Sequence, residues 1–115
     1  MADLFDASSS GGQQVLGASL LTDIYTCPDL KSVTVTVLFT ELAGVAGGKV
    51  RLSLSHTGKP NTLAQYLLYD MALDANGVTG LSGISLNQTD VLRGWSFNGN
   101  VAVNVLVESL QQYLA

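Results

Sequence analysis

The sequence predicts an all-β protein: a single-domain antiparallel β-sandwich, jelly-roll-like, with seven to eight strands. Apolar and polar residues alternate strictly over Ser32–Leu42 and again over Lys49–His56, which is the period of a half-buried strand. Turn signals such as Asn76-Gly77 and Asn98-Gly99 separate the apolar segments at regular spacing. A chain of 115 residues makes about one domain and can bury roughly two thirds of its unfolded surface without disulfides.

The first 14 residues are predicted to form a flexible N-terminal arm (1–14) ahead of a β-sandwich domain (15–115). Residues 8–14 have the Ser, Gly and Gln content of a flexible linker. Leu4 and Phe5 precede this linker and have no local apolar partner. Either the terminus frays, or Leu4 and Phe5 anchor the arm on a neighbouring subunit.

Short strands are predicted over residues 15–21 and 22–26, and Cys27-Pro28-Asp29 closes them as a turn because proline cannot donate to a β-ladder. The two clearest strands follow, over Ser32–Leu42 and Lys49–His56. We expect these two strands to pair with each other.

The segment Tyr66–Leu86 is predicted to be a hairpin, because Asn76-Gly77 between two apolar runs favours a type I′ turn. In the first of these strands both faces are partly apolar. Tyr66 and Leu68 lie on the face that a solvated strand would fill with polar residues, so this face is a predicted contact surface.

Glycines in the following strands are predicted to mark irregularities. Gly80 and Gly83 are expected at bulges or bends, and Gly94 at a bulge that re-aims Trp95. Asn98-Gly99 is expected to form a second type I′ turn.

The chain is predicted to end in a strand over residues 100–108 and a short segment over 109–115. Leu110, Tyr113 and Leu114 have helical spacing in this last segment. It is too short to be stable alone, so it covers either the core of its own domain or a neighbouring subunit.

The composition predicts a protein that works by contact. Only 12% of residues are charged and 47% are hydrophobic, with a mean hydropathy of +0.33, against roughly 25% charged in typical soluble domains. The net charge of -4 argues against nucleic-acid and anionic-membrane partners. We expect no secretory signal, because Asp3 and Asp6 stand where a signal peptide would have positively charged residues. No apolar run is long enough for a membrane helix.

No catalytic, cofactor-binding or metal-binding residues are assigned, and the chain is predicted not to be an enzyme. His56 is the only histidine, no Gly-x-Ser-x-Gly elbow is present, and one His with one Cys, Cys27, cannot build a zinc site. Asp70, Asp74 and Asn76 offer, within seven residues, oxygen ligands of the kind that calcium prefers. The turn at Asn76-Gly77 explains that loop without a metal, and calcium binding there stays an open alternative.

Several segments together resemble a known class of protein. They are Tyr25-Thr26-Cys27-Pro28, Thr34-Val35-Thr36-Val37, Tyr66-Leu67-Leu68-Tyr69-Asp70, Leu73, Ala75-Asn76-Gly77, Leu81-Ser82-Gly83-Ile84-Ser85-Leu86 and Asp90-Val91-Leu92. In strand and turn order the chain resembles, over roughly residues 22–108, small β-sandwich structural proteins of tailed bacteriophages that cement or decorate the capsid.

The resemblance implies a virion subunit on the capsid surface, made in the host cytoplasm. It implies a homo-oligomer, expected to be a trimer, that binds the major capsid protein. The expected interface residues are Leu4, Phe5, Leu38, Tyr66, Leu68, Leu106, Leu110 and Tyr113. The alternatives are a tail or baseplate accessory protein of the same fold, and a carbohydrate-binding adhesive module that stacks sugars on Trp95, Tyr66 or Tyr69.

Overall fold

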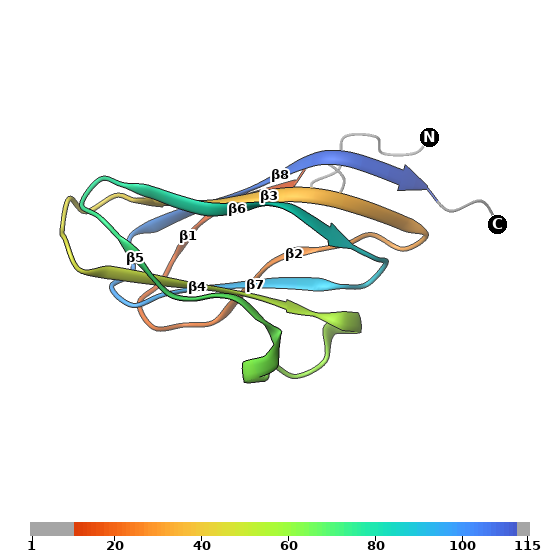
Figure 1. Cartoon of the computed structure of the whole chain (residues 1–115), viewed down its shortest axis with the longest axis horizontal. Coiled ribbons are helices and arrows are strands. Elements are labelled where there is room, and N and C mark those ends of the chain that lie inside the picture. The colour runs from red at the N-terminus through yellow and green to blue at the C-terminus, as the bar shows by residue number, and fades with distance from the viewer. Residues whose placement is uncertain (1–10, 113–115) are drawn as a thin grey trace.

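Two four-stranded antiparallel sheets pack face to face in the computed structural model, which describes residues 11–112 (Figure 1). The strands are β1 (Gly11–Leu16), β2 (Thr22–Thr26), β3 (Lys31–Glu41), β4 (Gly48–Ser55), β5 (Tyr66–Leu73), β6 (Val78–Leu86), β7 (Val91–Ser96) and β8 (Val101–Gln112). Two short 3₁₀ turns, η1 (His56–Gly58) and η2 (Leu63–Gln65), lie between β4 and β5. The all-β prediction is confirmed.

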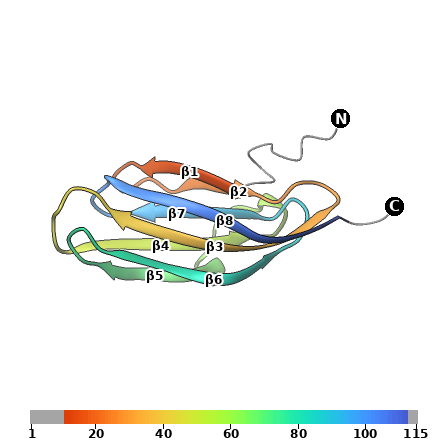
Figure 2. The same ribbon diagram turned by 90° about the horizontal axis from the view of Figure 1, so that it is seen from above.

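The strand order is that of a jelly roll. One sheet has the order β1-β8-β3-β6 and the other β2-β7-β4-β5 (Figure 2). The chain changes sheet at every connection except the one from β4 to β5. Eight strands in two sheets linked in this way form the double Greek key of a jelly roll, which confirms the predicted fold class.

Two predicted pairings are wrong, because the turns concerned connect strands of opposite sheets. β3 pairs with β6 and β8, and β4 pairs with β5 and β7, so β3 and β4 are not a hairpin. The segment from β5 to β6 likewise crosses between sheets. Both turns are predicted from local residues, which do not tell whether the chain returns to the same sheet.

The turn between β5 and β6 also differs from the predicted type I′. The Gly77 N–H donates to the Asp74 carbonyl oxygen at 2.9 Å, so Ala75 and Asn76 occupy the two central positions. Only Asn76 of these two has a positive φ, of 55°, whereas a type I′ turn requires both. Gly77 is needed for another reason: an added Cβ would lie 3.0 Å from the Asp74 carbonyl oxygen.

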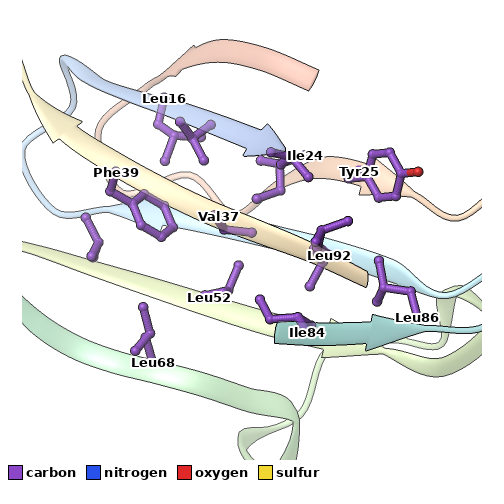
Figure 3. Close-up of a cluster of buried hydrophobic side chains, with 14 of the residues drawn as sticks. Leu16, Ile24, Tyr25, Val37, Phe39, Leu52, Leu68, Ile84, Leu86 and Leu92 are labelled. Carbon is purple, nitrogen blue, oxygen red and sulfur yellow. The ribbon is translucent and has the colours of Figure 1, made fainter. Parts of the chain in front are cut away.

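The core lies between the sheets and is built from the alternating residues (Figure 3). In β3 the predicted inward residues Val33, Val35, Val37 and Phe39 are all at most 3% exposed. Val103 of β8 lies beside them in the same sheet, and apolar residues of β4 and β7 such as Leu52 and Leu92 belong to the other sheet, across the core. Each fully buried side chain of this size stabilises the fold by about 1.5–3 kcal/mol.

The ends of the domain differ from the prediction. β1 begins at Gly11, so residues 11–14, expected in the arm, instead pair with Leu106–Val103 of β8. β8 continues to Gln112 beside Lys31–Thr34 of β3, so residues 109–112 are strand and not helical. Pairing with β3 provides hydrogen-bond partners for the backbone N–H and C=O groups of these residues. This gain outweighs the helical spacing of the side chains.

The predicted glycine irregularities are partly confirmed. Gly83, at φ 71°, lies in the bulge where β6 shifts register against β3. Gly80 is in regular strand, and an added Cβ would overlap the Val37 carbonyl oxygen. The pairing of β7 with β4 has no shift at Gly94. Leu92 and Trp95 therefore lie on opposite faces by ordinary alternation.

The second predicted type I′ turn is wrong as well. At the β7–β8 connection Gly99 and Asn100 have positive φ values of 73° and 52°, whereas Asn98 does not. The Gly99 N–H donates to Ser96 Oγ at 3.2 Å. Like the β5–β6 turn, this connection crosses between the two sheets.

Candidate functional site

The outer face of the β1-β8-β3-β6 sheet is uncharged along its paired rows. The register places three rows of residues across it: Val15, Ala102, Thr40 and Val78; Gln13, Asn104, Leu38 and Gly80; and Leu106 beside Thr36. We call these rows the uncharged face. The four strands contain three charged residues: Lys31 and Glu41 at the ends of β3, and Glu108 at the register shift of β8. A sheet face usually meets water with polar and charged side chains.

The expected interface residues do not form one surface. Leu38 and Leu106 lie on the uncharged face, half-buried and 45% exposed respectively. Tyr66 lies on the other sheet, in β5. The expectation that Leu68 is an interface residue is wrong, because Leu68 is 8% exposed and lies opposite Leu52 in the core. Leu110, 40% exposed, lies near the end of β8. The other three, Leu4, Phe5 and Tyr113, lie outside the described residues.

Irregular pairing in β5 explains the burial of Leu68. Tyr69 and Asp70 together lie opposite Arg51, between the pairs Leu52–Leu68 and Val50–Met71. Asp70 has a φ of 54°, so the strand bulges there. The extra residue reverses the alternation, which places both Leu68 and Met71 on the inward side.

The outer face of the other sheet carries an aromatic cluster around Arg51, which the bulge helps to build. The Arg51 Cζ lies 4.2 Å from the centre of the Tyr69 ring and 4.1 Å from that of Trp95. Its Nε donates to Asp70 Oδ1 at 2.6 Å. Tyr66 meets Tyr69 edge-on at a centroid distance of 4.9 Å. A guanidinium between two ring faces is a favourable cation–π arrangement.

The same contacts set the charges of the cluster. The hydrogen bond from Arg51 lowers the pKa of Asp70, and the bond to Asp70 raises the pKa of Arg51. Both groups therefore stay ionised at neutral pH. The rings that the sequence suggested as a sugar-stacking platform are brought together here, but Arg51 covers one face of Tyr69 and one face of Trp95.

Glu41, which the sequence analysis did not single out, fastens one end of the sandwich. It is 5% exposed. Its Oε1 accepts backbone N–H groups from Gly44 at 2.6 Å, Val45 at 3.2 Å and Asn76 at 3.0 Å. Its Oε2 accepts the backbone N–H of Ala43 at 3.0 Å. One carboxylate thus holds the β3–β4 loop and the β5–β6 turn together, and the Asn76 bond above all lowers its pKa.

Protonation of Glu41 is expected to loosen this end of the domain. Because its folded pKa lies below the ordinary value of 4.5, the carboxylate stabilises the fold at pH above that value, and this contribution is lost as the pH falls through the lowered pKa. Amide exchange at Gly44, Val45 and Asn76 should accelerate over that acidic range. Glu41→Gln, which keeps only one acceptor oxygen, should accelerate it at neutral pH, and unchanged exchange in this variant would refute the role of Glu41.

His56 lies beside a buried carboxylate, that of Asp90. Its Nδ1 is 3.3 Å from Asp90 Oδ1, and its own side chain is 71% exposed. Asp90 accepts the backbone N–H groups of Thr57 at 3.2 Å and Asn87 at 2.9 Å. The Asp90 carboxylate therefore has a structural use, which is to join η1 to the β6–β7 turn.

Metal-ligating side chains do not gather in residues 11–112: no group of three His, Cys, Asp or Glu that could hold an ion is found there. Asp70, one of the three suggested calcium ligands, accepts a hydrogen bond from Arg51. No helix in this part of the chain is long and apolar enough to span a bilayer.

The sequence matches no protein-family model, and comparisons with curated proteins and with solved structures also gave no match.

Proposed function

We propose that this chain is a non-enzymatic structural subunit of a tailed-phage virion, of the capsid cement or decoration type. In this role it binds the major capsid protein, stabilises the shell and assembles as a homo-oligomer. The observation that carries the proposal is the uncharged face. A protein of net charge -4 keeps charge off three paired rows of one sheet face, and interface cores are likewise depleted in charged residues.

The size of the uncharged face suits such a contact. Four strands about 4.8 Å apart, over the five positions Thr36–Thr40 that the rows span in β3, cover roughly 330 Å². A stable interface buries about 800 Å² on each partner, so this face would supply about two fifths of it. The aliphatic side chains Val15, Val78 and Leu106, each at least 45% exposed, would lose their contact with water there.

The fold supports the proposal by analogy. Jelly rolls recur in viral capsid and lectin domains, although a fold alone does not define a function. Segments that resemble phage cement proteins lie in strands of both sheets, for example Thr34–Val37 in β3 and Tyr66–Asp70 in β5.

A charge placed on the uncharged face is expected to weaken binding to the shell strongly. Capsids prepared without the protein are mixed with wild type or with Leu106→Lys, and bound protein is measured by co-sedimentation. We expect Leu106→Lys to bind about tenfold more weakly or worse, because a buried, unpaired ammonium is costly. Leu63→Lys is the control, since Leu63 is 78% exposed in η2 and should bind as wild type. Equal binding by wild type and Leu106→Lys would contradict the proposed face.

The alternative roles are separable by position and by ligand. A tail or baseplate accessory protein would be found on the tail when labelled virions are imaged. An adhesive module would bind glycans on an array, and Trp95→Ala would abolish that binding. Because Arg51 occupies one face of the Trp95 ring, less aromatic surface is available to a sugar than the sequence suggests.

A further inference from the structure

The two sides of the sandwich are closed to different degrees. On one side the edge strands β1 and β2 lie against each other (Figure 2). An added Cβ on Gly12 would lie 3.1 Å from the Ile24 carbonyl oxygen, and Gln14 Nε2 donates to the Asp23 carbonyl oxygen at 3.4 Å. On the other side lie the edge strands β5 and β6, which make few contacts with each other. This second side is the open edge of the domain.

Apolar side chains are exposed along the open edge. Leu67 and Met71 of β5 are 40% and 42% exposed, and Val78 of β6 is 61% exposed. Met71 lies opposite Val50, which is fully buried, so Met71 points into the sandwich and yet is accessible to water. The core is therefore not fully covered at this edge by residues 11–112.

Within the described part of the chain, the backbone of β6 has no partner strand on this side. Among these strands β6 pairs with β3 alone, and none of its nine residues is charged or proline. Natural edge strands are usually protected by charges, prolines or bulges. The bulge at Gly83 protects the second half of β6 and leaves Val78–Leu81 as a regular, uncharged edge. β5 is different, because Asp70 breaks its regular strand.

We propose that a second copy of this chain covers the open edge, by antiparallel pairing of β6 with β6 of its partner around a twofold axis near Thr79. Directly opposite residues share a sheet face. Val78 of one copy then lies opposite Gly80 of the other, and each sheet containing β6 continues across the contact. Met71 and Leu67 of both copies lie beside the new pair and lose their exposure.

The size of the edge and its charge select this partner. A twofold axis near Thr79 brings residues 77–81 of the two copies together, which is about 17 Å of strand. The shortest axis of the molecule runs from the β1/β2 side to the open edge, so the two sheets span the 28 Å axis at this edge (Figures 1 and 2). Roughly 480 Å² per copy would be covered, about 950 Å² in total, which is close to the ~1,000 Å² that a specific contact needs. Two copies that each carry -4 can approach here because β6 adds no like charges.

A trimer, the number expected from the resemblance, would require β6 to pair with a different edge of the next copy. The β1 and β2 edges lie against each other, and the β5 edge is broken at Asp70. The free edge that matches β6 best is therefore another β6, which gives a dimer. This contact specifies how the subunits of the proposed structural protein meet. The dimer contact is tested on the isolated protein. A result that refutes the dimer therefore does not bear on the proposed binding to the shell.

Light scattering on the purified chain tests the dimer. We expect a mass of 24 kDa, which is twice 12.0 kDa. Thr79→Lys should lower it to 12 kDa, because two ammonium groups would face each other across the axis and weaken association by about 100-fold or more. Gln14→Lys is the matched control, since Gln14 and Thr79 are the two ends of one inward row of the same sheet. It should remain at 24 kDa.

Circular dichroism establishes that both variants are folded. A second measurement uses the wild type alone. Amide hydrogen exchange in Val78–Leu81 should slow as the protein concentration rises through the dissociation constant of the dimer. A wild-type mass of 12 or 36 kDa, a Thr79→Lys mass of 24 kDa in folded protein, or exchange independent of concentration would each overturn the proposal.

Discussion

Val35→Asp is expected to prevent folding. Val35 is 0% exposed in the centre of β3, between Ile84 of β6 and Val107 of β8. A carboxylate there has no partner within the apolar core, and an uncompensated buried charge costs more than about 5 kcal/mol. Domains of this size are stable by only about 5–15 kcal/mol. Far-UV circular dichroism and soluble yield should show an unfolded or aggregated protein.

Thr36→Asp is the control for that experiment. Thr36 is the next residue in β3, half-buried on the outer side of the sheet, where water can solvate a carboxylate. This variant should fold with an unfolding free energy within about 1 kcal/mol of wild type. If both variants fold equally well, the assignment of inward and outward faces in β3 is wrong.

Gly80→Ala is expected to cause the second largest loss of stability. The added Cβ would overlap the Val37 carbonyl oxygen and lie 3.0 Å from Leu38 Cδ2, so β6 must move away from β3. Overpacking against backbone of this kind costs about 3 kcal/mol or more, and urea unfolding should show it. Because β6 carries the proposed dimer contact, the mass of this variant should also fall.

Gly17→Ala is the matched control. Gly17 has no heavy atom within 4 Å of an added Cβ and no positive φ. Its replacement should leave stability unchanged, or raise it by up to about 1 kcal/mol through the lower entropy of the unfolded chain. A similar loss in both variants would show that the close approach of β6 to β3 is not what requires Gly80.

The fold class is predictable here because alternation is unbroken where it matters most. Val33, Val35, Val37 and Phe39 alternate without an extra residue in β3, because the register shifts along this strand add residues to β6 and β8 instead. The structure buries all four side chains. Strand pairing is not predictable in the same way. A turn such as Asn76-Gly77 reports a local reversal, whereas the choice between the same and the opposite sheet depends on which apolar faces meet in the core.

The candidate surfaces show where alternation fails. Regular alternation along β5 predicts that Leu68 points outward. The extra residue near Asp70 shifts the alternation by one position, so Leu68 points inward instead. The Arg51 cluster depends on β7, β4 and β5 being neighbours, which the sequence does not state. The role of Glu41 could not be predicted, because the side chains that usually hold a turn by bonding its backbone are Asp, Asn, Ser and Thr rather than Glu. Its bond to the Asn76 N–H depends on the fold.

The heat resistance of the shell tests the central claim most directly. Capsids are prepared with and without this protein, and the temperature at which they release their contents is measured, with bound protein quantified on the same samples. We predict that decorated capsids release their contents at a higher temperature, and that Leu106→Lys gives neither binding nor protection. Capsids that behave identically with and without the protein, and that bind none of it, would contradict the proposed function.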